Sequence, residues 1–86
     1  MNEQFSLTLI IDNHPGVLSR VAGLFYKRGY NVDFLSSGAL KDQRYFIMYI
    51  VISGDNYVQD QIVKQLNKLE DVHKVELFEF ALPADQ

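Results

Sequence analysis

The chain has 86 residues, a formal charge of -3 at pH 7 and no cysteine. This length allows one domain with a modest core and leaves no room for a second domain. The absence of cysteine excludes disulfides, thiolate metal ligands and a thiol nucleophile, and it fits a reducing compartment. The negative charge and the scattered basic residues argue against nucleic acid as a partner, because binding to nucleic acid depends on neutralising phosphates.

The first residues of the chain do not resemble a targeting segment. Met1-Asn2-Glu3-Gln4 carries no basic residue, and the apolar run that follows is short and interrupted by Ser6 and Thr8. We therefore expect neither a signal peptide nor a transmembrane segment, and we expect the cytoplasm as the compartment.

The first predicted element is a strand that ends at Asp12 and Asn13. It has the period of two that is typical of a strand with one buried face, and its apolar residues are Phe5, Leu7, Leu9 and Ile11. A helix follows, with Pro15 expected at its first position and Asn13 or His14 in the cap region. Gly29 is expected to end this helix at the C′ position. Its apolar stripe consists of Leu18, Val21, Leu24 and Phe25.

The loop Asn13-His14-Pro15-Gly16 leads into that helix and has two interpretations. Gly16 lets another molecule approach the backbone closely. The free N–H groups and the dipole of the first helical turn favour a carboxylate or a phosphate. The same four residues also make an efficient turn and cap without any ligand. Local chemistry leaves both interpretations open.

The second and third predicted strands differ in their patterns. Tyr30 to about Ala39 begins with alternating apolar and polar residues, which predicts a strand. A polar turn over residues 41–44 follows, and Tyr45 to Ser53 is then almost wholly apolar. Such a run is typical of a strand that is covered on both faces or faces a partner. We expect it to be the most buried strand.

A second helix and a fourth strand complete the chain. Asp55 or Asn56 is expected to cap the helix after Gly54. Its apolar stripe consists of Val58, Ile62, Leu66 and Leu69, and its solvent-facing residues are Gln59, Asp60, Lys64, Gln65 and Lys68. After a turn at 70–71, the fourth strand covers residues 72–80. Its apolar residues divide between two faces, Val75 and Leu77 on one and Phe78 and Phe80 on the other.

This order of elements predicts an α+β fold of the ferredoxin-like βαββαβ type, with a four-stranded antiparallel sheet and two helices on one face. We expect the domain to cover residues 1–80 and residues 81–86 to form a flexible C-terminal tail. Because the helices cover one face and the third strand is apolar on both, a monomer would expose an apolar patch. The patch predicts a homodimer and would include alternate members of Phe46, Met48, Ile50 and Ile52.

Catalytic and metal chemistry find little support in the sequence. The two histidines, His14 and His73, are far apart and have no cluster of ligands around them, so we expect no metal site. His73 is expected to face solvent, whereas His14 lies in the loop, within reach of a ligand. Ser19 lies inside a helix rather than on a nucleophile elbow. The basic residues of the first helix are expected on a solvated face, and they are Arg20, Lys27 and Arg28.

Two other functions of this topology each lack a required feature. RNA-recognition modules stack bases on central-strand aromatic residues, but their Lys/Arg-Gly-aromatic-Gly/Ala-aromatic pattern is absent. A small hydrolase resembling an acylphosphatase would need an arginine in the loop before the first helix, and residues 12–16 contain none. We therefore expect no catalytic residue in this chain.

Two separated motifs give the chain a more specific resemblance. The first is Asn-His-Pro-Gly-Val-Leu-Ser-Arg-Val at 13–21, continued at 23–25 and 27–32, and the second covers 61–69 and 71–75. Over nearly its whole length the chain resembles the regulatory small subunit of acetolactate synthase, also called acetohydroxyacid synthase, which begins with an ACT domain.

The resemblance implies a homodimer and an amino-acid site. ACT domains of that family pair edge to edge through their second strands, and a feedback inhibitor, valine or a related branched-chain amino acid, binds at the interface. On this chain the site would consist of Asn13, His14, Gly16, Val17 and Leu18, with Asn31 from the partner. Backbone N–H groups of Gly16, Val17 and Leu18 would donate to the carboxylate. The side-chain oxygens of Asn13 and Asn31 would accept from the ammonium.

The resemblance also implies a catalytic partner. A separate large subunit would carry thiamine diphosphate, Mg and FAD and would condense pyruvate with a second 2-oxo acid, whereas this chain would bind none of these cofactors. Its role would be to activate the large subunit and make it sensitive to the amino acid. Many family members continue into a second domain, so the chain would be a short or truncated form. The alternative is an ACT module that regulates a different amino-acid enzyme.

Overall fold

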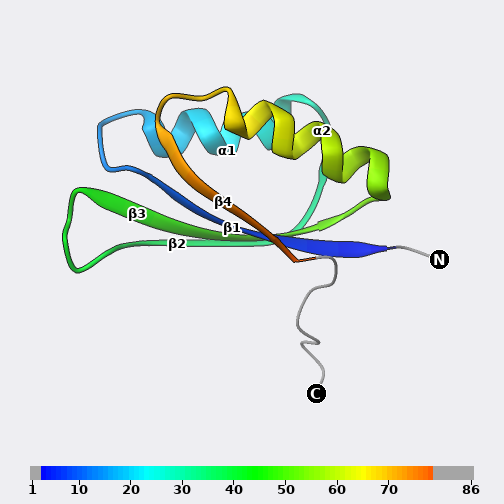
Figure 1. Ribbon diagram of the computed structural model, residues 1–86, viewed down its shortest axis with the longest axis horizontal. Coiled ribbons are helices and arrows are strands. Elements are labelled where there is room, and N and C mark those ends of the chain that lie inside the picture. Colours follow the sequence, from blue (N-terminus) through cyan, green and yellow to red (C-terminus); the bar gives the residue numbers. More distant parts are fainter. Residues whose placement is uncertain (1–2, 79–86) are drawn as a thin grey trace, which may run out of the picture.

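A computed structural model describes residues 3–78 of the chain. Its elements are β1 (Gln4–Asp12), α1 (Val17–Lys27), β2 (Asn31–Ala39), β3 (Tyr45–Ser53), α2 (Asn56–Asn67) and β4 (Val72–Phe78). Every predicted helix and strand is present, in the predicted order (Figure 1). The last two residues of the predicted fourth strand, including Phe80, and the predicted tail at 81–86 lie outside the described residues.

The four strands form one antiparallel sheet in the order β2-β3-β1-β4. Both helices cover the same face of this sheet (Figure 1). This arrangement confirms the predicted α+β, ferredoxin-like fold. β2 and β4 are the edge strands, so β1 and β3 lie at the centre. No helix within residues 3–78 is long and apolar enough to cross a membrane.

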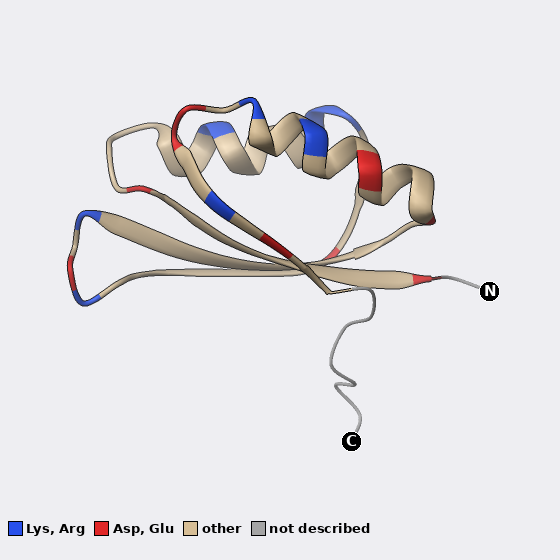
Figure 2. Ribbon diagram, viewed as in Figure 1, with Lys and Arg blue, Asp and Glu red and all other residues tan. Residues whose placement is uncertain are grey.

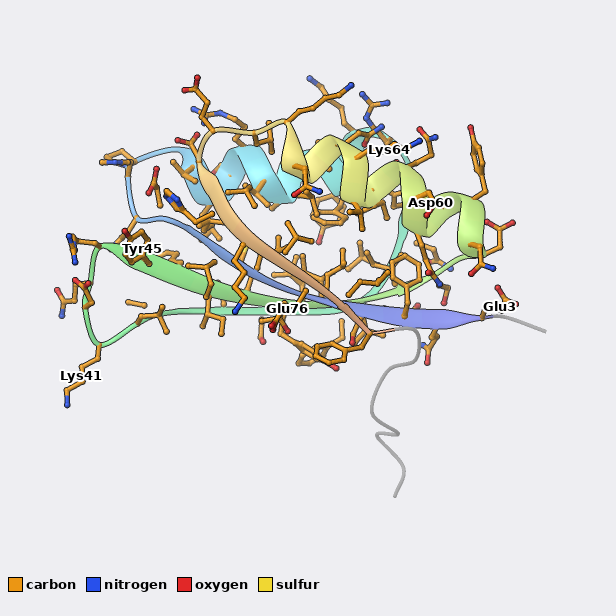
Figure 3. All side chains as sticks on the ribbon, viewed as in Figure 1. Glu3, Lys41, Tyr45, Asp60, Lys64 and Glu76 are labelled. Carbon is orange, nitrogen blue, oxygen red and sulfur yellow. The ribbon has the colours of Figure 1, made fainter. Side chains whose placement is uncertain are left out.

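The core lies between the sheet and the helices, where side chains fill the space (Figure 3). The alternation predicted for β1 is confirmed, because its four apolar residues at alternate positions are fully buried: Phe5, Leu7, Leu9 and Ile11. The same cluster includes Val17, Val21, Phe25, Met48, Ile50, Ile52, Ile62 and Leu66. Fully burying one side chain of this kind contributes roughly 1.5–3 kcal/mol. The face of the sheet under the helices therefore supplies most of the folding stability.

The exposed apolar residues of β3 are not the predicted ones. Met48, Ile50 and Ile52 are fully buried beneath the helices, so the predicted patch is wrong. The open face, by which we mean the face of the sheet without helices, carries instead Ile47, Tyr49 and Val51, of which Ile47 is exposed, Tyr49 is half-buried and Val51 is buried. A continuous apolar run has no period of two, so it does not reveal which residues face the core. β3 is also not the most buried strand, since β1 has five buried residues and β3 has four.

The predicted end of α1 at Gly29 is confirmed. Gly29 has a φ of 71°, a left-handed conformation that glycine adopts without strain. Its N–H donates to the Tyr26 carbonyl oxygen at 3.2 Å, and the Tyr30 N–H donates to the Phe25 carbonyl oxygen at 3.1 Å. These bonds form a Schellman motif, and the rings of Phe25 and Tyr30, with centroids 6.3 Å apart, add its apolar contact.

The predicted cap of α2 is confirmed, but one predicted surface residue of this helix is buried. The Asp55 side chain accepts a hydrogen bond from the Val58 N–H at 3.0 Å. Gln59, predicted to face water, is only 7% exposed, because it lies one turn before the buried Ile62 and shares its face of the helix. Gln65 is half-buried and accepts a hydrogen bond from the Tyr30 hydroxyl at 3.2 Å.

Candidate functional site

The loop that joins β1 to α1 is present as predicted, but the helix begins later than predicted. α1 starts at Val17, and its N-cap is Gly16, with φ 87° and ψ -14°. Pro15 therefore lies in the loop, and neither Asn13 nor His14 caps the helix with its side chain. The Val17 N–H donates to the His14 carbonyl oxygen at 3.1 Å and closes a tight turn before the helix. This turn depends on glycine, which adopts the left-handed conformation readily.

Replacing Gly16 with alanine is expected to lower the free energy of unfolding by about 1–2 kcal/mol, because a Cβ is strained in left-handed backbone. The matched control is Gly23→Ala inside α1, where a new Cβ meets no heavy atom within 4 Å. Alanine is more stable than glycine inside a helix by roughly 0.5–1 kcal/mol, so the control should gain stability. Urea unfolding measures both changes. A Gly16→Ala variant as stable as the natural chain would contradict the turn geometry.

Asn13 anchors the loop to the turn between β2 and β3. Its backbone N–H donates to the Arg44 carbonyl oxygen at 2.9 Å, and its side-chain Nδ2 donates to the Gln43 carbonyl oxygen at 2.8 Å. Because a carbonyl oxygen only accepts, these contacts orient the amide with Nδ2 toward the turn. Oδ1, on the other branch of the amide, remains available as an acceptor.

A shallow hollow of about 300 Å³ lies between the loop and this turn, and it is lined by Asp12, Asn13, His14, Gln43, Arg44 and Tyr45. The hollow brings together two predicted site residues and three residues of the turn and β3 that the sequence did not point to. No local pattern signals these three, because Asn13 and Gln43 are 30 residues apart in the chain. A larger hollow of about 700 Å³, along the outer surface of α1 around Gly23, includes none of the predicted site residues.

Acidic and basic residues lie together in the turn between β2 and β3 (Figure 2), and two of them, Asp42 and Arg44, form an ion pair. Arg44 donates from Nε to Asp42 Oδ1 at 3.0 Å and from Nη2 to Asp42 Oδ2 at 2.8 Å. These hydrogen bonds from Arg44 hold the pKa of the Asp42 carboxyl below its usual value, and they raise the pKa of Arg44. The Arg44 guanidinium also lies 5.7 Å from the centroid of the Tyr45 ring. Both members of the pair therefore stay charged at neutral pH.

Two contacts connect the base of the loop and α1 to the start of β4. His73 Nε2 lies 2.5 Å from Asp12 Oδ1, and the His73 ring packs edge-on against the Tyr45 ring with centroids 5.2 Å apart. Arg20 forms an ion pair with Asp71. The predicted solvent exposure of His73 and Arg20 holds only in part, because each also contacts a carboxylate. Such exposed pairs contribute about 0–1 kcal/mol each, so they add little to the stability of the fold.

The N-terminus of α1 is suited to an anion. The Arg20 N–H donates to the Gly16 carbonyl oxygen at 2.9 Å, which is the first bond of the helix. The N–H groups of Leu18 and Ser19 therefore precede the helical ladder and have no partner within it. α1 has no acidic residue in its first turn, so the positive end of its dipole is not compensated by its own side chains. Of the predicted N–H donors, that of Val17 is already used within the turn.

β2 begins at the opposite end of the sheet from the loop (Figure 1), and its first residue is Asn31. Asn31 lies opposite Ser53, and Ser53 also lies opposite Gln4 at the start of β1. The loop follows Asp12, at the other end of β1. A strand of nine residues spans roughly 25–30 Å, so Asn31 does not reach the loop of its own chain. A site that contains both Asn13 and Asn31 requires two chains.

Metal chemistry has no cluster to support it in the part of the chain that the structure describes. Within residues 3–78, no three His, Asp or Glu side chains gather in a group that could hold a metal ion. What the loop offers is hydrogen-bond donors at a helix N-terminus, an amide oxygen and a nearby guanidinium. This set suits a small ligand that carries a carboxylate.

Solved structures establish the class of the fold. The ACT domain of GTP pyrophosphokinase from Chlorobium tepidum matches with a TM-score of 0.80 over 99% of this chain and 96% of that chain, at 15% identity. The acetolactate synthase small subunit from Thermotoga maritima matches with a TM-score of 0.78 and 32% identity over 86% of this chain and 46% of that chain. The chain therefore has the fold of an ACT domain.

The sequence comparisons establish the family. The model of the AHAS small subunit-like ACT domain matches residues 7–74, and the chain belongs to this family. A probable acetolactate synthase small subunit from Archaeoglobus fulgidus is 44% identical over 70 residues, which are 81% of this chain and 44% of that protein. The acetolactate synthase small subunit from Mycobacterium avium is 43% identical over 70 residues, 81% of this chain and 42% of that protein. The resemblance inferred from the motifs is confirmed, and the chain spans less than half the length of these relatives.

Proposed function

We propose that this chain is a non-catalytic regulatory subunit of acetolactate synthase, which binds and activates the catalytic large subunit and confers feedback regulation by valine. Family membership and relatives named as small subunits of that enzyme support the proposal. The observation that carries the ligand part is the loop before α1, where helix N–H groups and an amide oxygen lie together. A separate large subunit would carry thiamine diphosphate, Mg and FAD, and the complex would work in the cytoplasm.

The loop offers one partner for each charged group of a free amino acid. N–H groups of Gly16 and Leu18, together with the helix dipole, would bind the carboxylate. Asn13 Oδ1, left free by the contact of Nδ2 with Gln43, would accept a hydrogen bond from the ammonium. Neutral amide groups do this without burying an additional charge. His14 is exposed at the rim of the hollow, within reach of a bound molecule.

A homodimer through β2 would complete this site with Asn31. β2 is an edge strand, so its outer backbone groups face no other strand among the described residues. If β2 pairs with the partner's β2 in antiparallel order, the Asn31 end of one strand meets the Ala39 end of the other. Ala39 leads into the turn that holds Asn13, so the partner's Asn31 would arrive at the correct end of the sheet. A ligand bound between two chains would have a higher affinity for one geometry of the dimer than for another. This difference in affinity would shift the dimer toward the favoured geometry and would be the source of regulation.

Reconstitution with the large subunit tests the proposal. Purified chain is mixed with the large subunit of the same organism, and acetolactate formation from pyruvate is measured with and without valine. We expect activation by the chain and inhibition by millimolar valine only when the chain is present. A chain that changed neither activity nor valine sensitivity would contradict the proposal. Copurification with a different amino-acid enzyme would instead favour the alternative regulatory role.

A further inference from the structure

The register of β2 against β3 contains one interruption. Val32 lies opposite Ile52 and Phe34 lies opposite Val51, so Asp33 has no opposite residue and forms a bulge. The Asp33 carboxylate oxygen Oδ2 accepts hydrogen bonds from Gln4 Nε2 at 2.9 Å and from Ser53 Oγ at 2.5 Å. The bulge is therefore held by side chains from both central strands, β1 and β3. Asn31 and Val32 pair with β3 before the bulge, and the regular segment after it covers residues 34–39 without interruption.

The two faces of this regular segment follow from its register. Residues opposite the β3 residues that lie in or pack against the core cluster are on the helix side: Leu35 is opposite Ile50, Ser37 is opposite Met48 and Ala39 is opposite Phe46. Residues opposite the other β3 residues lie on the open face, and they are Phe34, Ser36 and Gly38. In an antiparallel pair, directly opposite residues share a face. In residues 34–39, odd-numbered residues face the helices and even-numbered residues lie on the open face. When this segment pairs with its own copy about a two-fold axis, the numbers of two opposite residues must therefore be both even or both odd. The residue on the axis then lies opposite the same residue of the partner.

The bulge at Asp33 limits which residue can lie on the two-fold axis. An axis at Leu35 would place the bulge opposite Ser37, within the paired segment. An axis at Ser36 or at Ser37 keeps the bulge at the end of the paired segment. The side chains on the open face distinguish these two. An axis at Ser36 places Phe34 opposite Gly38 of the partner, and an axis at Ser37 places it opposite Leu40.

Phe34 and Gly38 are complementary in shape. The Phe34 residue is 53% exposed, and its ring packs edge-on against the Tyr49 ring with centroids 6.1 Å apart. Gly38 has open space above it, because a Cβ built there meets no heavy atom within 4 Å. An aromatic ring that lies across a glycine on the neighbouring strand covers exposed backbone and removes apolar surface from water.

We infer that the homodimer forms through β2 with Ser36 opposite Ser36 of the partner and with each Phe34 lying across Gly38 of the other chain. This inference rests on the proposed dimer and specifies its register. Counting across the bulge, Asn31 of the partner then lies beside Leu40, whose N–H donates to the Tyr45 carbonyl oxygen at 3.0 Å. Tyr45 lines the hollow next to Asn13. The bulge at Asp33 thus determines where Asn31 meets the other chain.

Single-cysteine crosslinking tests the register, and the chain suits it because it has no cysteine of its own. Ser36→Cys and Ser37→Cys are prepared separately and oxidised with copper-phenanthroline. In the inferred register the two Cα atoms at position 36 lie about 4.5–5.5 Å apart, within disulfide range. The two at position 37 lie roughly 8 Å apart, beyond it. We expect Ser36→Cys to crosslink at least about tenfold faster. Sedimentation velocity of the reduced variants reports the mass of the native assembly.

The outcomes separate this inference from the proposed dimer. Faster crosslinking of Ser37→Cys, or a dimer in which neither variant crosslinks, would overturn the register and leave the dimer standing. A monomeric mass at all concentrations would overturn both. In a second test, Gly38→Val is expected to raise the dimer dissociation constant at least about tenfold by obstructing the partner's Phe34, and Phe34→Ala in the same chain should reverse most of this. An unchanged dissociation constant for Gly38→Val would also overturn the register.

Discussion

Replacing Asn31 with alanine is expected to weaken valine binding by about 10–100-fold, because a hydrogen bond to a charged group contributes roughly 1.5–3 kcal/mol. Asn31 is exposed and far from the loop of its own chain, so the variant should fold and dimerise normally. Isothermal titration with valine measures the affinity, and lysine serves as the control ligand. Asn67→Ala, at the exposed end of α2, is the matched control and should bind valine normally.

A mixture of two inactive variants tests whether each site uses both chains. Asn13→Ala should also weaken binding, because it removes Oδ1 as well as the anchor to Gln43. In a mixed dimer, one site combines both substitutions and the other has both natural residues. After random exchange of equal amounts, half of the dimers are mixed, so about a quarter of the sites should bind valine with natural affinity. No recovery on mixing would contradict a site shared between chains.

Replacing Phe25 with alanine is expected to lower the free energy of unfolding by about 3–5 kcal/mol. Phe25 is fully buried in the core, and it also packs against Tyr30 in the motif that ends α1. Small domains have about 5–15 kcal/mol in total, so this variant approaches the limit of folding.

The neighbouring residue provides the control for that effect. Tyr26 is 66% exposed, and Tyr26→Ala should change the unfolding free energy by no more than about 0.5 kcal/mol. Urea unfolding followed by circular dichroism, at one fixed protein concentration, compares the two. Similar losses for both variants would contradict the assigned orientation of α1.

Elements with a local signal were predictable from the sequence. The alternation from Phe5 to Ile11, the cap at Asp55 and the glycine at the end of α1 each depend on residues close together in the chain, and the structure confirms all three. The beginning of α1 was predicted wrongly, because Pro15 is compatible with both a helical first position and a turn. In the structure Gly16 has a left-handed backbone and is the N-cap, so Pro15 lies in the turn and not in the helix.

Features that depend on register were not predictable from one sequence. The apolar run of β3 gave no indication of which residues face the helices, and only its pairing with β1 reveals it. The bulge at Asp33 was missed for the same reason, since a bulge exists only relative to the neighbouring strand. Likewise, the loop anchor from Asn13 to Gln43 and the contact of Asp12 with His73 join distant segments. Of the site itself, the loop residues were indicated by their motif, but the residues across the hollow were not.

The position of β1 has a consequence for the order in which the domain assembles. β1 is first in the chain yet lies between β3 and β4, which come from the middle and the end of the described residues. The pairing of β1 with β3 and the pairing of β1 with β4 therefore each close a long loop. The entropy lost in closing such a loop disfavours folding until the contacts between the strands have formed. During synthesis β1 gains its second neighbour only when β4 emerges, and until then one edge of the central strand is open to misassembly with other chains.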